Sequence, residues 1–397
     1  MPGLDPSALR VVHVVPSLKV AGGGPARSVM RLASAQQRLG VSVCVVTGAA
    51  AKGVGDDGED TSAAGVEVHR CRHLALPFEL PSSGMIRVLD REIGRADVVH
   101  LHSLWNGTVT AAARIARKSG VPYIISPRGM LDPTAVRQRR PFKQLYRALV
   151  DRPTLDGAAG FHFLTSYEQE TAVWPSRVGQ RTIVIPNGID VAAVERAAES
   201  VSPALFSSGR ANLLYLGRLH ISKGLELQVD ALSLLKAKKI DAGLFFVGPD
   251  DGEAAALKHH AGTCGVGDRV HVLAPEYSDR RFGLLKQADC VLLTSHFEGN
   301  SVSAMETMAV GGLLIATDTT HLDEAARYDA AIVVKRDATL VAEAIARVLE
   351  NPDFGNSLRR HAVDYARTHL ESAVIARRML NFYDEVLGMA FAARASA

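Results

Sequence analysis

Residues 212–224, NLLYLGRLHISKG, open with an apolar run that ends at a glycine. A short, almost wholly apolar run of this kind is typical of a strand buried on both faces of a parallel sheet. Further apolar runs follow, with helix-length segments between most of them, at 243–248, 269–273, 290–293 and 313–316. This alternation predicts a doubly wound α/β domain in the C-terminal half of the chain.

The N-terminal half shows the same alternation. Its apolar runs lie at 10–15, 41–47, 97–102, 123–126 and 182–185, with a helical pattern at 26–39. Because 397 residues are too many for one ordinary core, we expect two Rossmann-like, doubly wound parallel-sheet domains that face a central cleft. We place them at 1–200 and 201–375, with the polar stretch before Arg210 as a linker and 376–397 as a helix that packs on the first domain.

Composition and charge exclude several classes of protein. The net charge of +3 is small and no recognised binding module accompanies it, so we expect no nucleic-acid partner. The N-terminus carries Asp5 and no long apolar run, unlike a signal peptide, and no run reaches the roughly 18 apolar residues of a membrane span. The four cysteines form no C-x-x-C pair, which favours buried thiols in a reducing compartment. We therefore expect a cytoplasmic protein.

Two glutamates, Glu298 and Glu306, are separated by seven residues near a predicted helix start. Glu298 precedes the turn Gly299-Asn300-Ser301, and Glu306 lies within an apolar run. A carboxylate in apolar surroundings needs a partner, and the hydroxyl groups of a sugar or a ribose offer hydrogen-bond donors. Gly299 permits a ligand to approach the backbone closely, and Asn300 and Ser301 are expected to offer N–H groups. Charges on a helix surface are the alternative interpretation.

A pair of cations, Arg218 and Lys223, follows the apolar run that opens the second domain. We expect Ser222 to cap a helix that begins near Lys223. The free N–H groups at a helix start, with two cations nearby, suit a diphosphate. Solvated basic side chains are the alternative, which the Glu298 segment in the same domain makes less attractive.

The turn Gly22-Gly23-Gly24-Pro25 follows the first strand of the N-terminal domain. It departs from the G-x-G-x-x-G pattern of dinucleotide-binding proteins, because Arg27 stands at the position of the third glycine. Glycines at this turn would still let a phosphate approach the backbone. Alone, this signal is weak.

His100 and His102 alternate along one strand, so both side chains point to the same face. Metal ligation has to be considered, but no third ligand stands at a convincing spacing. We expect His100 to be a buried structural residue. His102 is nearer the end of the strand and is the better candidate for the cleft.

The segment 114–152 is rich in cations and contains only two acids, Asp132 and Asp151. A solvated basic face explains this charge. Contact with an anionic acceptor or with an anionic membrane surface is the alternative, which Phe142 and Tyr146 favour slightly. The basic residues are Arg114, Arg117, Lys118, Arg128, Arg137, Arg139, Arg140, Lys143, Arg147 and Arg152.

These segments together resemble the large family of retaining GT-B glycosyltransferases that includes bacterial mannosyl-, glucosyl- and phosphatidylinositol-mannosyltransferases and sucrose synthases. The resemblance spans nearly all of the chain. The cation pair together with the spacing of the two glutamates is specific, and the block 126–130, SPRGM, resembles enzymes of exopolysaccharide and lipopolysaccharide assembly. Supporting matches are Gly23-Gly24, His100-Leu101-His102 and the block 185–190.

The resemblance implies a GT-B fold, a UDP- or GDP-linked sugar as donor, and a glycan, a lipid-linked or a small-molecule acceptor. It implies that Arg218 and Lys223 bind the donor diphosphate and that the turn at Gly23 and Gly24 contacts the same phosphates. His102 would approach the transferred sugar near its reacting carbon.

The resemblance also assigns roles to the segment 298–306. Glu298 would bind hydroxyl groups of the donor sugar, with Gly299 and the N–H groups around Asn300 and Ser301, while Glu306 would hold the ribose. His102, Arg218, Lys223 and Glu298 would form the catalytic set.

The chain departs from the family pattern at Asn300-Ser301, where a pair such as Phe-Gly is usual, which leaves the donor sugar open. A second departure, Leu313 after Gly312 where a proline is usual, is expected to be structural. The family favours front-face attack with retention, in which the leaving phosphate accepts the acceptor's proton. Since the chain has no D-x-D motif, we expect no metal requirement.

Other functions remain open at this point. A sugar-nucleotide epimerase or hydrolase can share this architecture, and a non-catalytic nucleotide-sugar-binding subunit would keep the same binding residues. A nicotinamide-dependent oxidoreductase is disfavoured by the missing G-x-G-x-x-G pattern.

Overall fold

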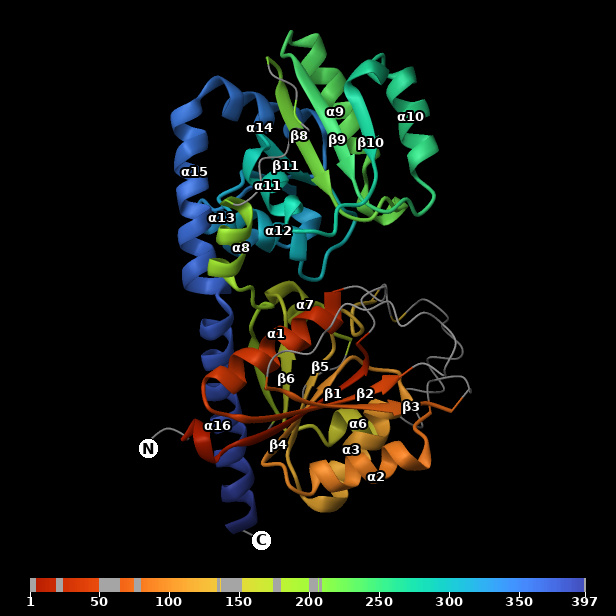
Figure 1. Ribbon diagram of the computed structural model, residues 1–397, viewed down its shortest axis with the longest axis vertical. Coiled ribbons are helices and arrows are strands. Elements are labelled where there is room, and N and C mark those ends of the chain that lie inside the picture. Colours follow the sequence, from red (N-terminus) through yellow and green to blue (C-terminus); the bar gives the residue numbers. More distant parts are fainter. Residues whose placement is uncertain are drawn as a thin grey trace. The chain divides into compact units, whose positions relative to one another are not determined.

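The structure is a computed structural model (Figure 1), and it describes residues 5–18, 24–49, 65–74, 80–133, 136, 152–173, 180–199, 206 and 209–395. The chain folds into two compact units. The N-terminal unit comprises residues 1–188 and 372–397, and the C-terminal unit comprises residues 189–371.

The N-terminal unit contains a seven-stranded sheet in the order β3-β2-β1-β4-β5-β6-β7, and each pair of neighbours is parallel. The order reverses between β1 and β4, as in a doubly wound fold. The strands are β1 (Arg10–Ser17), β2 (Ser42–Ala49), β3 (Glu67–Arg72), β4 (Val98–His102), β5 (Tyr123–Ser126), β6 (Gly160–Phe163) and β7 (Arg181–Val184).

Helices cover both faces of this sheet. Val11 of β1 belongs to the same buried cluster as residues of α1 and as Met379 of α16, whereas Val12 belongs to the opposite cluster with Met85 of α2. Both faces of β1 are therefore apolar, which is why its sequence shows no polar alternation. The helices are α1 (Gly24–Arg38), α2 (Ser83–Ile93), α3 (Gly107–Ser119), α6 (Arg152–Asp156), α7 (Ser166–Thr171) and α16 (Ser372–Ala395).

The C-terminal unit has a six-stranded parallel sheet in the order β10-β9-β8-β11-β12-β13. Its strands are β8 (Ala211–Leu216), β9 (Ala242–Val247), β10 (Val270–Leu273), β11 (Cys290–Leu293), β12 (Leu314–Thr317) and β13 (Ile332–Val334). Its helices are α8 (Val191–Glu199), α9 (Glu226–Ala237), α10 (Ala254–Thr263), α11 (Arg280–Gln287), α12 (Val302–Ala309), α13 (Asp323–Arg327), α14 (Ala338–Glu350) and α15 (Pro352–Tyr365), and a π-helical turn, Ala366–Leu370, follows α15.

The two doubly wound parallel sheets expected from the sequence are confirmed, but the boundaries between the units differ. The stretch after Asp190 contains α8, so describing it as a linker was wrong. The carboxylate of Asp190 accepts a hydrogen bond from the N–H of Ala193 at 2.9 Å, and Val191 and Val194 are buried in the core of the C-terminal unit. That unit therefore runs from Ile189 to Glu371 rather than from 201 to 375, and all of α16 belongs to the N-terminal unit.

Candidate functional site

The candidate site of the C-terminal unit lies where the order of its sheet reverses. β8 has β9 on one side and β11 on the other. Since the strands are parallel, the loops that leave the carboxyl ends of β8 and β11 meet at this edge, where ligands of doubly wound sheets bind. Arg218 and Lys223 lie on the first loop, and Glu298 lies on the second.

A short 3-10 helix, Ile221–Lys223, shapes the loop after β8. Its N-cap is His220, whose Nδ1 accepts a hydrogen bond from the N–H of Ser222 at 3.1 Å. The expectation that Ser222 caps a helix is therefore wrong. α9 begins only at Glu226, so Lys223 ends a tight turn instead of starting an α-helix.

Gly224 closes this turn in the left-handed conformation, with a φ of 58°. A Cβ atom at this position would lie 2.5 Å from the carbonyl oxygen of Thr294 and 2.6 Å from Nη2 of Arg336. Both the backbone conformation and the crowding therefore require glycine here. The turn is packed directly against the end of β11.

Lys223 and Glu298 form an ion pair between the two loops. The Nζ atom of Lys223 donates to Oε1 of Glu298 at 2.6 Å, and the Oγ of Ser295 donates to the same oxygen at 2.8 Å. The two side chains are only 21% and 14% exposed. This contact brings the two loops together at one edge of the sheet.

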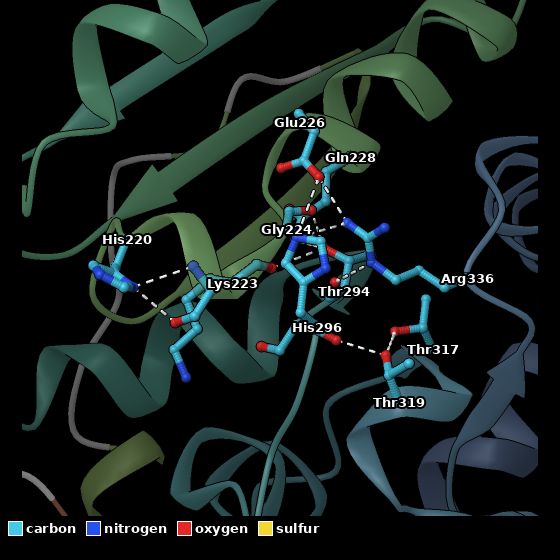
Figure 2. A network of polar contacts seen from close by, with 12 residues as sticks. His220, Lys223, Gly224, Glu226, Gln228, Thr294, His296, Thr317, Thr319 and Arg336 are labelled. Atoms are coloured by element: carbon cyan, nitrogen blue, oxygen red, sulfur yellow. Dashed lines mark hydrogen bonds and ion pairs between the residues drawn. The ribbon is translucent and has the colours of Figure 1, made fainter. Parts of the chain in front are cut away.

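Arg336, in the loop between β13 and α14, connects both loops (Figure 2). Its Nη2 donates to Oε1 of Glu226 at 2.7 Å and lies 3.2 Å from Nε2 of His296, and its Nε donates to the carbonyl of Thr294 at 3.4 Å. The hydroxyl of Thr294 donates to the carbonyl of Gly224 at 2.9 Å. These contacts fasten the turn that carries Lys223 to the strand end that leads to Glu298.

Arg218 and Glu306 have different surroundings from that central pair. Arg218 is exposed and forms a 3.3 Å surface ion pair with Asp251. Such a pair contributes little free energy, so the guanidinium can leave it for a ligand at low cost. Glu306 is buried within α12 and pairs with Arg281 of α11 at 3.5 Å.

The segment between the two glutamates forms the start of α12. Ser301 is its N-cap, and its hydroxyl accepts a hydrogen bond from the N–H of Ala304 at 3.3 Å. Gly299 has no atom within 4 Å of the position that a Cβ would take, so it borders open space. Asn300 is partly exposed beside it. The segment therefore brings backbone N–H groups to the same edge as Lys223.

The glycine-rich turn of the N-terminal unit is described only in part. Gly23 lies outside the described residues, and Gly24 is the first residue of α1. α1 follows β1, which lies beside β4 where the order of the first sheet reverses. Gly24 thus stands at the equivalent edge of the N-terminal unit.

His102, the better candidate for the cleft from its place near the end of the strand, is fully buried. It belongs to a group of four buried histidines with His13, His100 and His162. Burial lowers the pKa of His13 to about 4 and of His162 to about 3, and it lowers the pKa of His100 and His102 well below the usual value. All four imidazoles are therefore neutral at pH 7.

His13 is the third potential metal ligand that the sequence did not reveal, because it lies on a different strand. Its ring nitrogens and those of His100 and His102 are already hydrogen-bonded to protein groups, and the cation of Arg128 lies beside them. The described residues contain three groups whose possible ligand atoms lie within 4.8 Å of one another: His13/His100/His102, Cys44/Glu67/His69/Glu92 and Asp230/His260/Cys264. In the second group, Arg10 and Arg91 pair with the carboxylate of Glu92 at 2.7 and 2.6 Å. We assign a metal to none of them.

Three residues other than glycine adopt the left-handed conformation at the carboxyl ends of β4 and β5. These are Ser103 (φ 73°), Trp105 (φ 55°) and Arg128 (φ 55°). Such conformations cost free energy and cluster at functional sites. This edge of the N-terminal unit is therefore a second candidate site. The basic residues from Arg137 to Arg147 lie outside the described residues.

Two family models match the chain: the Glycosyl transferase 4-like domain at residues 23–188 and the Glycosyl transferases group 1 domain at residues 199–369. The chain belongs to the GT-B glycosyltransferases. The crystal structure of Anabaena HepE in complex with UDP superposes with a TM-score of 0.72 at 15% identity, over 95% of this chain and 100% of that one. That structure shares the two-domain Rossmann-like fold.

Two relatives have comparable identity to this chain. A GDP-mannose:cellobiosyl-diphosphopolyprenol alpha-mannosyltransferase of Xanthomonas oryzae pv. oryzae is 25% identical over 395 residues, which cover 96% of this chain and 98% of that one. A D-inositol 3-phosphate glycosyltransferase of Mycolicibacterium gilvum is 26% identical over 242 residues, which cover 58% of this chain and 53% of the relative, about half its length. In the described part of this GT-B chain, no helix is both long and apolar enough to cross a bilayer.

Proposed function

We propose that the protein transfers a hexose from a UDP- or GDP-linked sugar to a hydroxyl group of a glycan, a lipid-linked or a small-molecule acceptor, with retention of the anomeric configuration. The ion pair between Lys223 and Glu298 carries this proposal. It combines a cation suited to a diphosphate with a carboxylate suited to sugar hydroxyls, at the edge of the sheet where nucleotides bind. The mannosyltransferase relative, by its name, uses GDP-mannose, and HepE binds UDP.

Lys223 can bind the donor while it keeps its ion pair with Glu298. A lysine ammonium has three N–H donors, and Glu298 accepts one of them at 2.6 Å. The others can bind oxygen atoms of the diphosphate while the second carboxylate oxygen of Glu298 accepts from a sugar hydroxyl. Arg218 would join from its exposed position, because its surface pair with Asp251 is weak.

The reaction that we propose breaks the bond between the anomeric carbon and the diphosphate oxygen. The acceptor oxygen forms its bond to the same face of that carbon, and its proton passes to the departing diphosphate. Arg218 and Lys223 stabilise the negative charge that develops on the leaving group. Two protein cations at this position replace the divalent ion that other enzymes use, so we propose that no metal is required.

Incubation of the purified protein with labelled UDP- and GDP-hexoses and a panel of acceptors tests the proposal. We expect a glycoside whose anomeric configuration, read from the proton NMR coupling constant, equals that of the donor. Activity should persist in EDTA. An inverted product would exclude retention, and activity that EDTA abolishes and magnesium or manganese restores would exclude metal independence.

The same donor without an acceptor separates the alternatives. An epimerase or a hydrolase would consume it and release an isomerised or free sugar, and a non-catalytic subunit would bind it unchanged. We expect the donor to stay intact until an acceptor is added. Cytoplasmic location and contact of the basic segment 114–152 with an anionic membrane stay predictions.

A further inference from the structure

The buried histidines form part of one hydrogen-bonded chain, and Arg128 begins it. A guanidinium can only donate, so Nη2 of Arg128 donates to Nδ1 of His102 at 3.3 Å. The hydrogen of neutral His102 is then on Nε2, which lies 3.0 Å from Nδ1 of His13. His13 in turn donates from Nε2 to Oε1 of Gln36 at 2.8 Å.

The hydrogen-bonded chain continues through Tyr383 of the helix α16. Nε2 of Gln36 donates to the hydroxyl of Tyr383 at 3.2 Å, and this hydroxyl donates to Nδ1 of His100 at 2.7 Å. Nε2 of His100 then donates to the hydroxyl of Ser126 at 2.6 Å. Every member after Arg128 so far accepts one of these hydrogen bonds and donates another.

A backbone carbonyl ends the chain. The hydroxyl of Ser126 donates to Nδ1 of His162 at 2.7 Å, and Nε2 of His162 donates to the carbonyl oxygen of Ile185 at 2.8 Å. A carbonyl oxygen can only accept. The direction of donation is therefore set at both ends, by a group that cannot accept and by a group that cannot donate.

This direction leaves one arrangement of protons. Turning the amide of Gln36 over would make both ring nitrogens of His102 acceptors, because Arg128 donates to one of them. At the other end, the reversed direction would leave Nε2 of His162 without a hydrogen opposite the carbonyl oxygen of Ile185, which has none to donate. The first arrangement is impossible for a neutral imidazole and the second loses the hydrogen bond, so His102 is fixed as the Nε2–H tautomer with both nitrogens occupied. It has no lone pair to serve as a general base.

Arg128 is the one partly exposed member of this hydrogen-bonded chain, since the others are buried. Its Nη1 donates to the hydroxyl of Ser28 at 2.9 Å and to Oδ1 of Asn187 at 3.3 Å. These acceptors and His102 are all neutral. Among the described residues Arg128 forms no ion pair, and its Nε–H is enclosed without an acceptor.

The neighbouring carboxylate of Glu168 is engaged elsewhere. Its two oxygens accept from the N–H groups of Gly129 at 2.5 Å and of Leu164 at 2.7 Å, which holds the loop after β5 in place. A cation that is largely removed from water and lacks a bonded counterion is costly. Burial lowers the pKa of Arg128 only to about 10, so it stays charged at pH 7. This arrangement suits a site that receives an anion.

We propose that Arg128 binds an anionic group of the substrate, of the phosphate class, at the carboxyl edge of β4 and β5, and that His102 is the positioning residue that orients it. The inference rests on the proposed function, since it assigns the acceptor side of that reaction a phosphate-bearing substrate. The proposal also changes the role expected for His102. In this proposal His102 orients the guanidinium of Arg128 and does not contact the transferred sugar.

Inorganic phosphate is the probe, in the full-length protein carrying Lys223→Met so that the donor site of the C-terminal unit is weakened. Both tryptophans of the chain, Trp105 and Trp174, belong to the N-terminal unit, so their fluorescence reports the thermal unfolding of that unit alone. At constant ionic strength we expect phosphate to raise its unfolding temperature. Arg128→Met should abolish this rise, and Arg114→Met, which removes an exposed cation of the same unit, should leave it unchanged.

Equal phosphate effects in the parent and in Arg128→Met would overturn the proposal, and so would the lack of an effect in the parent. The measured quantity is the change in unfolding temperature on addition of phosphate, so a variant whose unfolding temperature without phosphate differs from that of the parent can still be compared with it. If Arg128→Met does not fold, Arg128→Lys serves as the second variant. It keeps the charge but cannot reach Ser28 and His102 together, and it should at least halve the phosphate effect.

His102→Asn and His102→Leu test the positioning role. An asparagine side chain can accept from Arg128 but cannot act as an acid or base, so it should keep most of the phosphate effect, whereas leucine should lose it. Nitrogen NMR of labelled histidines should show the Nε2–H tautomer for His102. A loss of the effect in both variants, or the opposite tautomer, would contradict the role. None of these measurements needs a donor, so absence of sugar transfer with an intact phosphate effect would count against the proposed function alone.

Discussion

The ammonium group of Lys223 lies 2.6 Å from the carboxylate of Glu298, across a separation of 75 residues in the chain. The contact depends on the order of the second sheet, which places β8 beside β11. A ligand at this edge meets both side chains together. They are therefore expected to act as a unit on the donor, and their substitutions should not be independent.

Replacement of this pair should impair transfer strongly. We expect Lys223→Met and Glu298→Gln each to lower kcat/KM roughly a hundredfold, about 3 kcal/mol, because each removes a charge-assisted contact to the donor. The double variant should lose much less than the product of the two effects. Lys335→Met is the control, since Lys335 forms a 2.9 Å ion pair with Asp318 but is 81% exposed. A fully multiplicative loss, or an equal loss in the control, would contradict this interpretation.

Arg336 should affect the binding of the donor without contacting it. Arg336→Met removes the shared partner of Glu226, Thr294 and the ring of His296. We expect the donor KM to rise roughly tenfold, as befits the loss of charge-assisted hydrogen bonds, with the circular dichroism spectrum unchanged. Arg347→Met, an exposed arginine of α14, is the matched control. A normal KM in Arg336→Met would show that the two loops hold their positions without it.

Gly224→Ala should abolish donor binding through crowding and not only through backbone strain. Its Cβ would lie 2.5 Å from the carbonyl oxygen of Thr294. Gly265→Ala provides the comparison, because Gly265 has a similar φ of 70° but no atom within 4 Å. Both substitutions should cost at least about 1 kcal/mol of folding free energy. Calorimetric titration with UDP and GDP should show loss of binding in Gly224→Ala alone, and retention in both variants would refute the steric argument.

The central strands of both sheets could be predicted from the sequence because each is buried on both faces and therefore apolar throughout. β3 and β13 are edge strands, and β3 reads EVHRCR, whose polar residues face water. β6 is only four residues long and contains a glycine and a histidine. β3 and β6 therefore lack the continuous apolar run that identified the others, and β13, Ile332–Val334, is apolar but only three residues long.

The candidate site could be predicted to the level of its loops but not of its partners. Lys223 and Glu298 each follow a predicted strand, and ligands of doubly wound sheets bind beyond the carboxyl ends of the strands. Arg281 and Arg336 support the site from α11 and from the loop after β13, and no motif accompanies them. His13 gave no signal because its partners lie on other elements. Such contacts depend on how side chains pack in three dimensions.

The buried histidines should make the N-terminal unit sensitive to mild acid. The pKa of His13 is about 4 and that of His162 about 3 in the folded protein, against 6.5 for an exposed imidazole. The unfolded chain therefore binds more protons than the folded chain between these values. Stability rises with pH across this range, is fully present above about pH 6.5, and is lost as the pH falls toward 4.

Each of these groups should contribute up to about 1.4 kcal/mol per pH unit within this window. Urea unfolding of the N-terminal unit, followed by the fluorescence of Trp105 and Trp174, should therefore require less denaturant at pH 5 than at pH 7. His162→Gln removes one titrating imidazole while an amide can still donate to the carbonyl of Ile185, so its stability should change less between the two pH values. Most carboxyl groups titrate below this window and add little to the difference. An unfolding midpoint independent of pH, or an unchanged difference in His162→Gln, would show that the histidines are not held neutral by the fold.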